Sequence, residues 1–308
     1  MPSAPVPLPA TVPLPADEAR LVRSRLDDLG LPGLIDVHTH FMPKRVLDKV
    51  WAYFDVAGPK LGRPWPIAYR GSDEERVARL RALGVERFTS LSYPHRPGMA
   101  PFLNEWSAGF ADAHPDCLRS ATFFPEEGAG DYVRDVIAAG TQVFKVHVQV
   151  GEFDPNDPLL DDVWGVLQES GTPVVIHSGD GPVPGQHTGV VGMVELLRRF
   201  PELTLVVAHL GMPEYAEFLD LCAVHPRVHL DTTMAFTAFT EAIHPFPPEL
   251  RGRLGEVGDR VLFGSDFPNI PYSYLEAVDA VIGLDLGREW TRNVLRENAA
   301  RLFGIVPS

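Results

Sequence analysis

The sequence contains little cysteine and no long apolar run. Its 308 residues include two cysteines, Cys117 and Cys222, and no CxxC pair, which argues against a cysteine-based zinc site. No run of 18 apolar residues occurs, so no segment is predicted to span a membrane. The N-terminus also lacks a basic region followed by an apolar stretch, the pattern of a secretion signal. We therefore expect a cytoplasmic protein.

Basic residues are also in short supply. The chain carries 27 Lys and Arg against 41 Asp and Glu, a net charge of −14. Binding of nucleic acid needs a basic face that neutralises phosphates, so nucleic acid is not an expected partner. With 45% hydrophobic residues the chain can bury a large core, as one large barrel or as two domains. These numbers fit an enzyme or a binding protein with a small-molecule partner.

The N-terminal segment is rich in proline. Over residues 1–16 the motif VPLPA occurs twice, at 6–10 and 12–16. Proline supplies no amide donor and favours extended chain, so we expect 1–16 to form a loose, flexible arm. The next stretch, ADEARLVRSRLDDLG, begins with acidic residues and ends at Gly30. This pattern predicts a short amphipathic helix.

Short apolar runs alternate with longer amphipathic patterns from Gly33 onward. Such alternation predicts parallel strands joined by helices. Eight strand candidates within 33–304 match the usual size of an eight-stranded α/β barrel, about 250 residues. We therefore expect an α/β fold, a (β/α)8 TIM barrel that forms one catalytic domain over 17–308. The strand candidates are 34–40, 87–93, 118–124, 142–148, 173–177, 203–209, 228–233 and 260–266.

An open, doubly wound sheet is the main alternative fold. It normally has a glycine-rich turn after its first strand, where this chain has HTHFMP (38–43) instead. A long insertion at 41–71, rich in aromatic residues and proline, follows this first strand. We expect the insertion either to cover the mouth of the barrel as a lid or to contact a second subunit.

Polar side chains close several strand candidates. The carboxyl ends of barrel strands lie on one face, where active sites form. His38 and His40 are two residues apart, so they point the same way from an extended chain. Burial of so many polar groups is costly unless they share a partner such as a divalent cation. A hydrogen-bonded structural cluster is the alternative. The residues at these ends are His38, His40, Lys145, His147, His177, His209 and Asp266.

Several motifs at these strand ends carry a resemblance. The chain resembles the amidohydrolase superfamily, in the amidohydrolase-related branch that contains aminocarboxymuconate semialdehyde decarboxylase, γ-resorcylate decarboxylase and several lactone hydrolases. The resemblance implies a metal-dependent TIM-barrel enzyme, and dimers are common in the branch. The motifs follow in the expected order through nearly all of 33–304. They are IDVHTHFMP, FKVHVQVGEFDPNDPLLDDVW, PVVIHSG, VVAHLG, VLFGSDFPNIPY and NAARLFG.

The resemblance also implies roles for single residues. His38, His40, His177 and Asp266 map to metal ligands, and Asp266 also takes the proton of the attacking water. His209 maps to a catalytic acid/base or electrophile. The expected cofactor is one divalent metal ion, with Zn²⁺ favoured and Mn²⁺ or Fe²⁺ as alternatives, because imidazole and carboxylate suit all three.

Lys145 has more than one interpretation. Some members of the superfamily carboxylate a lysine of the fourth strand so that it bridges two metals. The KVH of this chain instead resembles the KLH of members that usually hold one metal, which makes Lys145 an ion-pair partner or a substrate contact. The residues expected to contact substrate are Lys145, His147, His95, Arg96, Phe267 and Asn269.

The reaction has three interpretations. In the first, water activated by the metal attacks the carbonyl of a small amide, ester or lactone. In the second, the same metal holds a small aromatic or muconate-like carboxylic acid, which loses carbon dioxide without oxidation. In the third, the barrel binds metal without catalysis. The complete set of ligands and base favours an enzyme, and a homodimer is expected from the resemblance to the branch alone.

Overall fold

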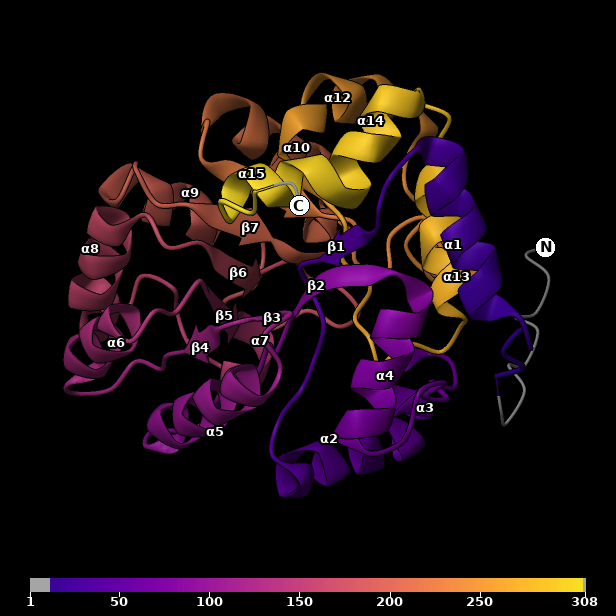
Figure 1. The fold of residues 1–308 in the computed structure, drawn as a ribbon. Helices are drawn as coiled ribbons and strands as arrows, with labels where there is room; N and C mark the ends of the chain where they lie inside the picture. The colour runs from indigo at the N-terminus through magenta and orange to yellow at the C-terminus, as the bar shows by residue number, and fades with distance from the viewer. Residues whose placement is uncertain (1–11, 307–308) are drawn as a thin grey trace.

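The computed structural model describes residues 12–306, in which parallel strands are surrounded by helices (Figure 1). Most of the predicted proline-rich arm, residues 1–11, lies outside the described residues. No helix among residues 12–306 is both long enough and apolar enough to cross a bilayer. The fold is the predicted (β/α)8 TIM barrel, and the candidate site lies at the carboxyl ends of its strands.

The strands form two parallel sheets with the orders β1-β2-β3 and β4-β5-β6-β7-β8-β9. Neighbours along the chain are neighbours in each sheet, as right-handed βαβ units require. The third predicted strand is divided at Arg119 into β3 and β4, so eight strand positions carry nine strands. The strands are β1 (Leu34–Asp36), β2 (Val85–Thr89), β3 (Cys117–Leu118), β4 (Ser120–Thr122), β5 (Val143–His147), β6 (Val174–His177), β7 (Leu205–Val207), β8 (Val228–Asp231) and β9 (Val261–Leu262).

The first and last strands are joined just beyond their ends. The Val37 N–H donates to the Phe263 carbonyl at 3.0 Å, and the His40 N–H donates to the Phe267 carbonyl at 2.7 Å. Thr39 and Phe267 form a parallel bridge. These contacts bring the segment after β1 against the segment after β9, although the ladder of named strands is not continuous there. The sequence segments 38–40 and 263–267 therefore meet at one place.

Helices pack around the strands, and several short ones fill the loops (Figure 1). Their bounds are α1 (Glu18–Leu29), α2 (Lys44–Val56), α3 (Gly58–Leu61), α4 (Asp73–Leu83), α5 (Met99–Ala113), α6 (Ala129–Ala138), α7 (Val148–Gly151), α8 (Asp161–Ser170), α9 (Val190–Arg199), α10 (Tyr215–Val224), α11 (Ala238–Glu241), α12 (Arg251–Glu256), α13 (Tyr274–Ile282), α14 (Arg288–Arg292) and α15 (Asn298–Leu302).

Local sequence explains where α4 begins and ends. The Ser72 hydroxyl accepts from the Glu75 N–H, and the Glu75 carboxylate accepts from the Ser72 N–H, which completes a capping box. Gly84 ends the helix with φ of 91°, a left-handed conformation that favours glycine. The helix then leads directly into β2, so both ends of α4 are determined by residues visible in the sequence.

The predicted N-terminal helix is α1, which lies beside α13 (Figure 1). It buries Val22 and Leu26, and its Glu18 side chain is also buried. The Glu18 carboxylate accepts from the Tyr69 hydroxyl at 2.5 Å. Because Tyr69 belongs to the 41–71 insertion, this contact ties the first helix to the insertion.

The insertion at 41–71 folds into α2 and α3 rather than an irregular loop. It is held against the loop after β9 through Asn269. The Trp51 Nε1–H donates to the Asn269 side-chain oxygen at 2.9 Å, and the Trp65 Nε1–H donates to the Asn269 carbonyl at 2.7 Å. Two tryptophans on one asparagine place the insertion beside the segment after β9, which carries Asp266.

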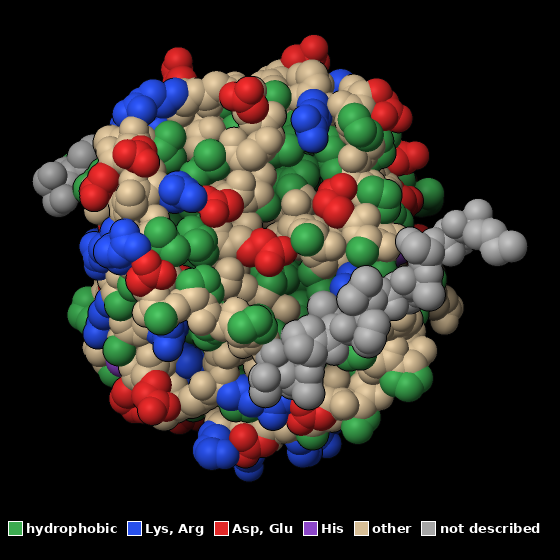
Figure 2. All heavy atoms as spheres, turned by 90° about the vertical axis from the view of Figure 1, so that its right-hand side faces the viewer, with side chains coloured by type: hydrophobic (Ala, Val, Ile, Leu, Met, Phe, Trp, Pro, Cys, Tyr) green, Lys and Arg blue, Asp and Glu red, His purple; other side chains and the backbone are tan. Residues whose placement is uncertain are grey.

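Charges of both signs are mixed on the face that carries α1 and α13. Figure 2 shows Asp and Glu side chains interspersed with Lys and Arg over this face. One pair there joins the Arg25 Nε of α1 to the Asp279 carboxylate of α13 at 2.7 Å. Exposed pairs of this kind contribute little to stability, about 0–1 kcal/mol each. Acidic side chains are thus not gathered into a single patch on this face.

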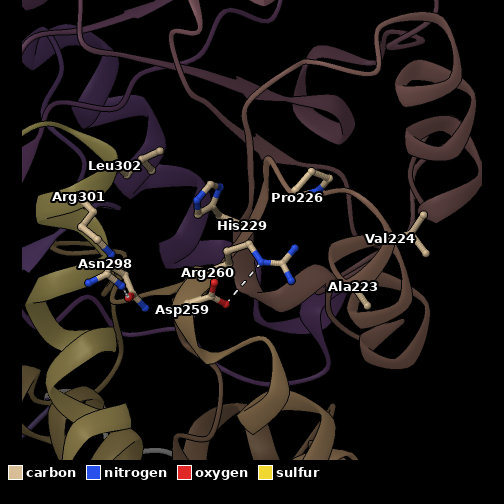
Figure 3. Close-up of a pocket in the computed structure, with 9 residues that line it drawn as sticks. All are labelled: Ala223, Val224, Pro226, His229, Asp259, Arg260, Asn298, Arg301 and Leu302. Carbon is tan, nitrogen blue, oxygen red and sulfur yellow. Dashed lines mark hydrogen bonds and ion pairs between the residues drawn. The ribbon is translucent and has the colours of Figure 1, made fainter.

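The amino ends of β8 and β9 border a hollow of about 700 Å³ (Figure 3). Its polar side chains are paired within the protein. Asn298 donates to the Gly258 carbonyl at 2.7 Å and to the Val261 carbonyl at 2.6 Å. Arg260 donates to the His225 carbonyl at 3.1 Å, and Arg301 donates to the Asn298 side-chain oxygen. These hydrogen bonds indicate a structural role for the amino end of the barrel.

Candidate active site at the carboxyl end of the barrel

A larger cavity, of about 1330 Å³, opens at the carboxyl ends of the strands. The chain approaches it from β1, β5, β6, β7 and β9, and the insertion forms part of its wall. Polar side chains from all five strand ends therefore face one space, as the barrel topology predicted. The strand-end residues that line it are His38, His40, Lys145, His147, His177, His209 and Asp266.

Three of these residues converge closely. The His40 Nε2 lies 2.7 Å from Asp266 Oδ1, and the His38 Nε2 lies 3.7 Å from the same oxygen. One nitrogen of each histidine and one Asp266 oxygen all lie within 4.8 Å of one another. The hydrogen bonds between the segments after β1 and β9 create this group, because they hold the two histidines of one segment against Asp266 of the other.

Hydrogen bonds fix which nitrogen of each histidine faces the cavity. His38 Nδ1–H donates to the Asp231 carboxylate at 2.8 Å, and His40 Nδ1–H donates to the Leu91 carbonyl at 2.9 Å. Both Nε2 atoms then carry lone pairs, and they face a carboxylate that also has only lone pairs to offer. Acceptors set 2.7 Å apart repel unless a proton or a cation lies among them. The donor set therefore fits a divalent metal.

The charges of the group support the same conclusion. Burial lowers the pKa of His38 to about 3, and the positive charge of Lys145 adds to that shift, so the ring stays neutral. Burial by itself would raise the pKa of Asp266, but its neighbours in the group, His40 first among them, bring it well below the usual range, so the carboxylate is ionised. Neutral imidazole and ionised carboxylate are the forms that bind divalent metals.

Asp36 lies beneath the histidines and joins β1 to the loop after β9. Its carboxylate accepts from the Ser265 hydroxyl at 2.6 Å, the Tyr274 hydroxyl at 2.8 Å and the His38 N–H at 3.2 Å. Burial raises the pKa of Asp36 to about 7 despite these donors. A glycine at position 264 is required nearby, because a Cβ there would lie 2.8 Å from the His38 Cβ and 2.1 Å from the Thr233 hydroxyl.

Asp266 and His209 both have left-handed backbone conformations. Their φ values are 71° and 56°, which is uncommon for residues with a side chain. The Asp266 N–H donates to the His38 carbonyl at 2.9 Å. The His209 N–H donates to the Asp231 carboxylate at 2.8 Å. Strained residues that neighbours hold in place are typical of functional sites.

The His209 ring is oriented toward the cavity. Its Nδ1–H donates to the Thr233 carbonyl at 3.0 Å, and its Nε2 has no hydrogen-bond partner within residues 12–306. Burial lowers the pKa of His209, so the neutral ring presents a lone pair at Nε2. In this form His209 is positioned as a proton acceptor.

His147 and His177 form a stacked pair. They occupy the same register on β5 and β6, with ring centroids 3.9 Å apart and an angle of 15° between the rings. His177 Nε2–H donates to the Gly181 carbonyl at 2.9 Å. Burial lowers the pKa of both rings well below the usual value. His177 lies in the cavity but outside the close group of His38, His40 and Asp266.

Comparison with known proteins identifies the family. A family model described as Amidohydrolase matches residues 35–305, most of the chain. The chain belongs to the amidohydrolase family. The resemblance seen in the motifs is thereby confirmed, and the chain is an enzyme. No curated protein matches this amidohydrolase closely enough to count as a relative.

Several solved structures share the fold of this chain. An uncharacterised TIM-barrel protein from Bordetella bronchiseptica is 20% identical with a TM-score of 0.71, over 88% of this chain and 98% of that one. A putative 2-pyrone-4,6-dicarboxylic acid hydrolase from Pseudomonas putida is 17% identical with a TM-score of 0.61, over 90% and 99%. A dihydroxybenzoic acid decarboxylase from Polaromonas sp. JS666, with bound manganese and 2-nitroresorcinol, is 17% identical with a TM-score of 0.61, over 90% and 98%.

Lys145 of the amidohydrolase lies in the floor of the cavity. Its Nζ is 3.2 Å from the His38 Nε2, and the side chain is almost fully buried. Burial lowers the pKa of Lys145 to about 8, while the charges of Asp231 and Asp266 oppose that shift. Lys145 thus stands beside the candidate metal group, where either predicted role is sterically open to it.

The predicted rim residues lie in different places. His95 and Arg96 are exposed and line the cavity, and the buried Asn269 also lines it while it accepts from Trp51. Phe267 does not reach the cavity wall, because its ring packs in the core with its centroid 5.0 Å from that of Tyr69. The residue after Asp266 therefore points away from the ligand space.

Sequence reasoning missed two features of the amidohydrolase site. Asp231 closes the β8 run VHLD and bonds to His38, and the rule that selected strand-end histidines applied to this carboxylate also. The cations of the insertion gave no such signal, because nothing in their spacing indicated which face of α2 meets the cavity. They are Arg45, Lys49 and Lys60.

Proposed function

We propose that this amidohydrolase is a metal-dependent hydrolase that acts on the carbonyl group of a small, negatively charged amide, ester or lactone. One observation carries the proposal. Two bare histidine nitrogens and an ionised carboxylate converge within 4.8 Å at the floor of a cavity of about 1330 Å³. Such a group fits a divalent cation, and the cavity offers space for a small substrate beside it.

The charge of the cavity supports an anionic substrate. Away from the strand ends, four cationic side chains line the wall, against Glu152 as the one carboxylate. The whole chain has the opposite balance, 27 basic residues against 41 acidic ones. A cationic wall in an acidic protein concentrates anions at the mouth. The four cations are Arg45, Lys49, Lys60 and Arg96.

The roles of the side chains follow from their protonation states. A divalent metal, when bound, polarises a carbonyl oxygen and lowers the pKa of water. Asp266 is ionised and lies at the metal group, so it accepts the proton of the attacking water. His209 presents a bare Nε2 to the cavity, so the proton that Asp266 removes from the water passes to this nitrogen and from it to the leaving group. Arg45 and Lys49 hold the substrate anion.

The identity and number of metals belong to the proposal. Zinc is the favoured ion because nitrogen and carboxylate ligands suit it. Manganese is the alternative, since the decarboxylase structure from Polaromonas contains it. We propose one ion, with His177 as a further ligand after its ring leaves the Gly181 carbonyl. Carboxylation of Lys145 to hold a second ion is the alternative arrangement.

Non-oxidative decarboxylation is the second candidate function. The cationic wall favours it as well, because a carboxylate is the leaving group of that reaction. Two of the similar structures are named as a hydrolase and a decarboxylase, so both reactions occur on this fold. In this candidate, Asp266 or His209 protonates the carbon from which carbon dioxide departs.

One experiment separates the two reactions. Protein stripped with chelator and reloaded with zinc or manganese is incubated in ¹⁸O-labelled water with lactones, esters, amides and aromatic carboxylic acids. Label in a product acid supports the hydrolase, and released carbon dioxide together with an unlabelled, decarboxylated organic product supports the decarboxylase. Turnover that persists in the stripped protein contradicts both. The predicted cytoplasmic location and homodimer stay predictions, and light scattering of the purified protein tests the dimer.

A further inference from the structure

One buried carboxylate contacts both the candidate metal group and the candidate proton acceptor. Asp231, the last residue of β8, is fully buried. It accepts three hydrogen bonds, and all of them reach the site. The donors are His38 Nδ1 at 2.8 Å, the His209 N–H at 2.8 Å and the Thr233 N–H at 3.1 Å.

The bond to His38 determines which ring nitrogen holds the proton. A carboxylate accepts only, so Nδ1 of His38 must be the donor and Nε2 must be bare. Nε2 is the atom that faces Lys145 and Asp266, at 3.2 and 3.7 Å. An anion behind the ring also makes Nε2 a stronger ligand, as carboxylate partners of metal-bound histidines do.

The bonds to the backbone determine where His209 points. Asp231 Oδ1 holds the N–H of His209 while that residue has a φ of 56°. The same oxygen holds the N–H of Thr233, whose carbonyl accepts from His209 Nδ1. Asp231 Oδ1 thus holds both the backbone of His209 and the residue whose carbonyl accepts the His209 ring proton. This arrangement leaves the His209 Nε2 free toward the cavity.

A merely structural role explains these contacts less well. Burial of an ionised carboxylate is costly, and the two backbone donors alone would be served by a neutral amide or hydroxyl. Only the contact to the His38 ring requires an acceptor with no proton of its own. The negative charge is therefore needed at the point where it meets the candidate ligand.

We propose that Asp231 is a positioning residue that sets the His38 tautomer for metal binding and aims His209 at the substrate. This inference rests on the metal-dependent function proposed above. Asp231 does not touch the cavity itself, so it acts through the two histidines. Replacement by asparagine keeps the shape and the backbone acceptor but presents an N–H to His38. His38 would then carry its proton at Nε2, the atom that must bind metal.

The first test uses the wild-type protein without metal. Nitrogen NMR of histidine-labelled protein, with His38 assigned from a His38→Gln variant, reports which ring nitrogen is protonated. We expect a proton at Nδ1 and a bare Nε2. A proton at Nε2 of His38 in this sample would overturn the inference, and this measurement is independent of whether any variant folds.

The second test compares Asp231→Asn with Asp116→Asn, a carboxylate-to-amide change at the other end of the barrel. We expect zinc affinity, measured by competition with a chromophoric chelator, to fall about 10- to 100-fold in Asp231→Asn alone. The His38 proton should move to Nε2 in the same variant. Unchanged affinity with a folded protein contradicts the inference, whereas failure of the wild type to bind zinc or manganese contradicts the proposed function.

Discussion

The two ends of the barrel are both hollowed, yet their polar atoms are arranged in opposite ways. At the amino end Asn298 donates both amide hydrogens to carbonyls, and Arg260 and Arg301 are bonded to the protein. At the carboxyl end, the lone pairs of His38, His40 and Asp266 face one another. At the amino end these polar atoms have partners within the protein, whereas at the carboxyl end the lone pairs lack a shared partner. Whether the polar atoms around a hollow have partners therefore says more about function than the hollow itself.

The largest expected effect is at Asp266. Asp266→Asn removes the proton acceptor while it retains the shape of the side chain, so kcat should fall about 10³-fold. Bound metal should largely remain, since His38 and His40 are unchanged. Steady-state kinetics and elemental analysis of the same preparation provide the measurement. Asp259→Asn, which alters a carboxylate beside the amino-end hollow, is the control, and equal losses in the two variants would remove the distinction between the ends.

The next effect concerns metal affinity. His40→Ala removes one of the converging nitrogens, so zinc affinity should fall by more than about 100-fold, because even outer partners of ligands contribute 10- to 100-fold. Chelator competition measures this loss. Substitution of a histidine at the amino end, His229→Ala, serves as the control. Tight binding by the His40 variant would show that the close group is not the metal site.

At the amino end the expected effect is on stability. Asn298→Ala leaves the carbonyls of Gly258 and Val261 without their donors, which should lower the free energy of unfolding by about 2 kcal/mol. Urea unfolding followed by circular dichroism measures the loss. The kcat of the folded fraction should not change. A selective fall in kcat without a fall in stability would assign chemistry to this end after all.

A smaller effect is expected at the cavity wall. Arg45→Ala combined with Lys49→Ala should raise KM for an anionic substrate about tenfold and leave kcat unchanged, because uniform binding is lost. Lys44→Ala is a matched control, since Lys44 is on the same helix but bonds to Asp48 at 2.7 Å. Equal KM values in the two proteins would contradict a role for the wall in binding the anion.

The smallest effect is a pH dependence at the amino end. Burial raises the pKa of Asp116, but the Arg81 hydrogen bonds at 2.7 Å outweigh burial and leave the pKa below its usual value. The pair therefore stabilises the fold above the unfolded pKa of about 4, and this contribution is lost as pH falls through the folded pKa. Comparison of Arg81→Ala with wild type should show a difference of about 0.5 kcal/mol at pH 7 and less at pH 3. A constant difference would contradict this assignment.

The alternation of apolar runs with amphipathic patterns was sufficient to predict the barrel. It placed every strand position, because burial of parallel strands requires continuous apolar segments. It overestimated their lengths, since His38, His40, His209 and Asp266 lie beyond the named ladders. These residues depend on bonds between distant segments, such as Asp266 N–H to the His38 carbonyl, and such bonds have no local sequence signal.

The candidate site was predictable only in part for the same reason. The two-residue spacing of His38 and His40 correctly indicated side chains on one side of the chain. The direction of Phe267 was not predictable, because the left-handed turn at Asp266 sends the next ring into the core. The helical insertion and its cations depend on Trp51 and Trp65 reaching Asn269, a contact over some two hundred residues of sequence.

The contact of Glu18 with Tyr69 has a consequence for where the folding unit begins. Tyr69 in turn accepts from the Tyr274 N–H at 2.6 Å, and the Tyr274 hydroxyl donates to Asp36 beneath the histidines. The family match starts at residue 35 and so excludes α1. A chain shortened to that boundary would expose the core surface that Val22 and Leu26 of α1 cover. It would also remove Glu18, the first member of a series of hydrogen bonds that reaches the floor of the active site. We therefore expect the minimal catalytic unit to include α1, one helix before the shared family region.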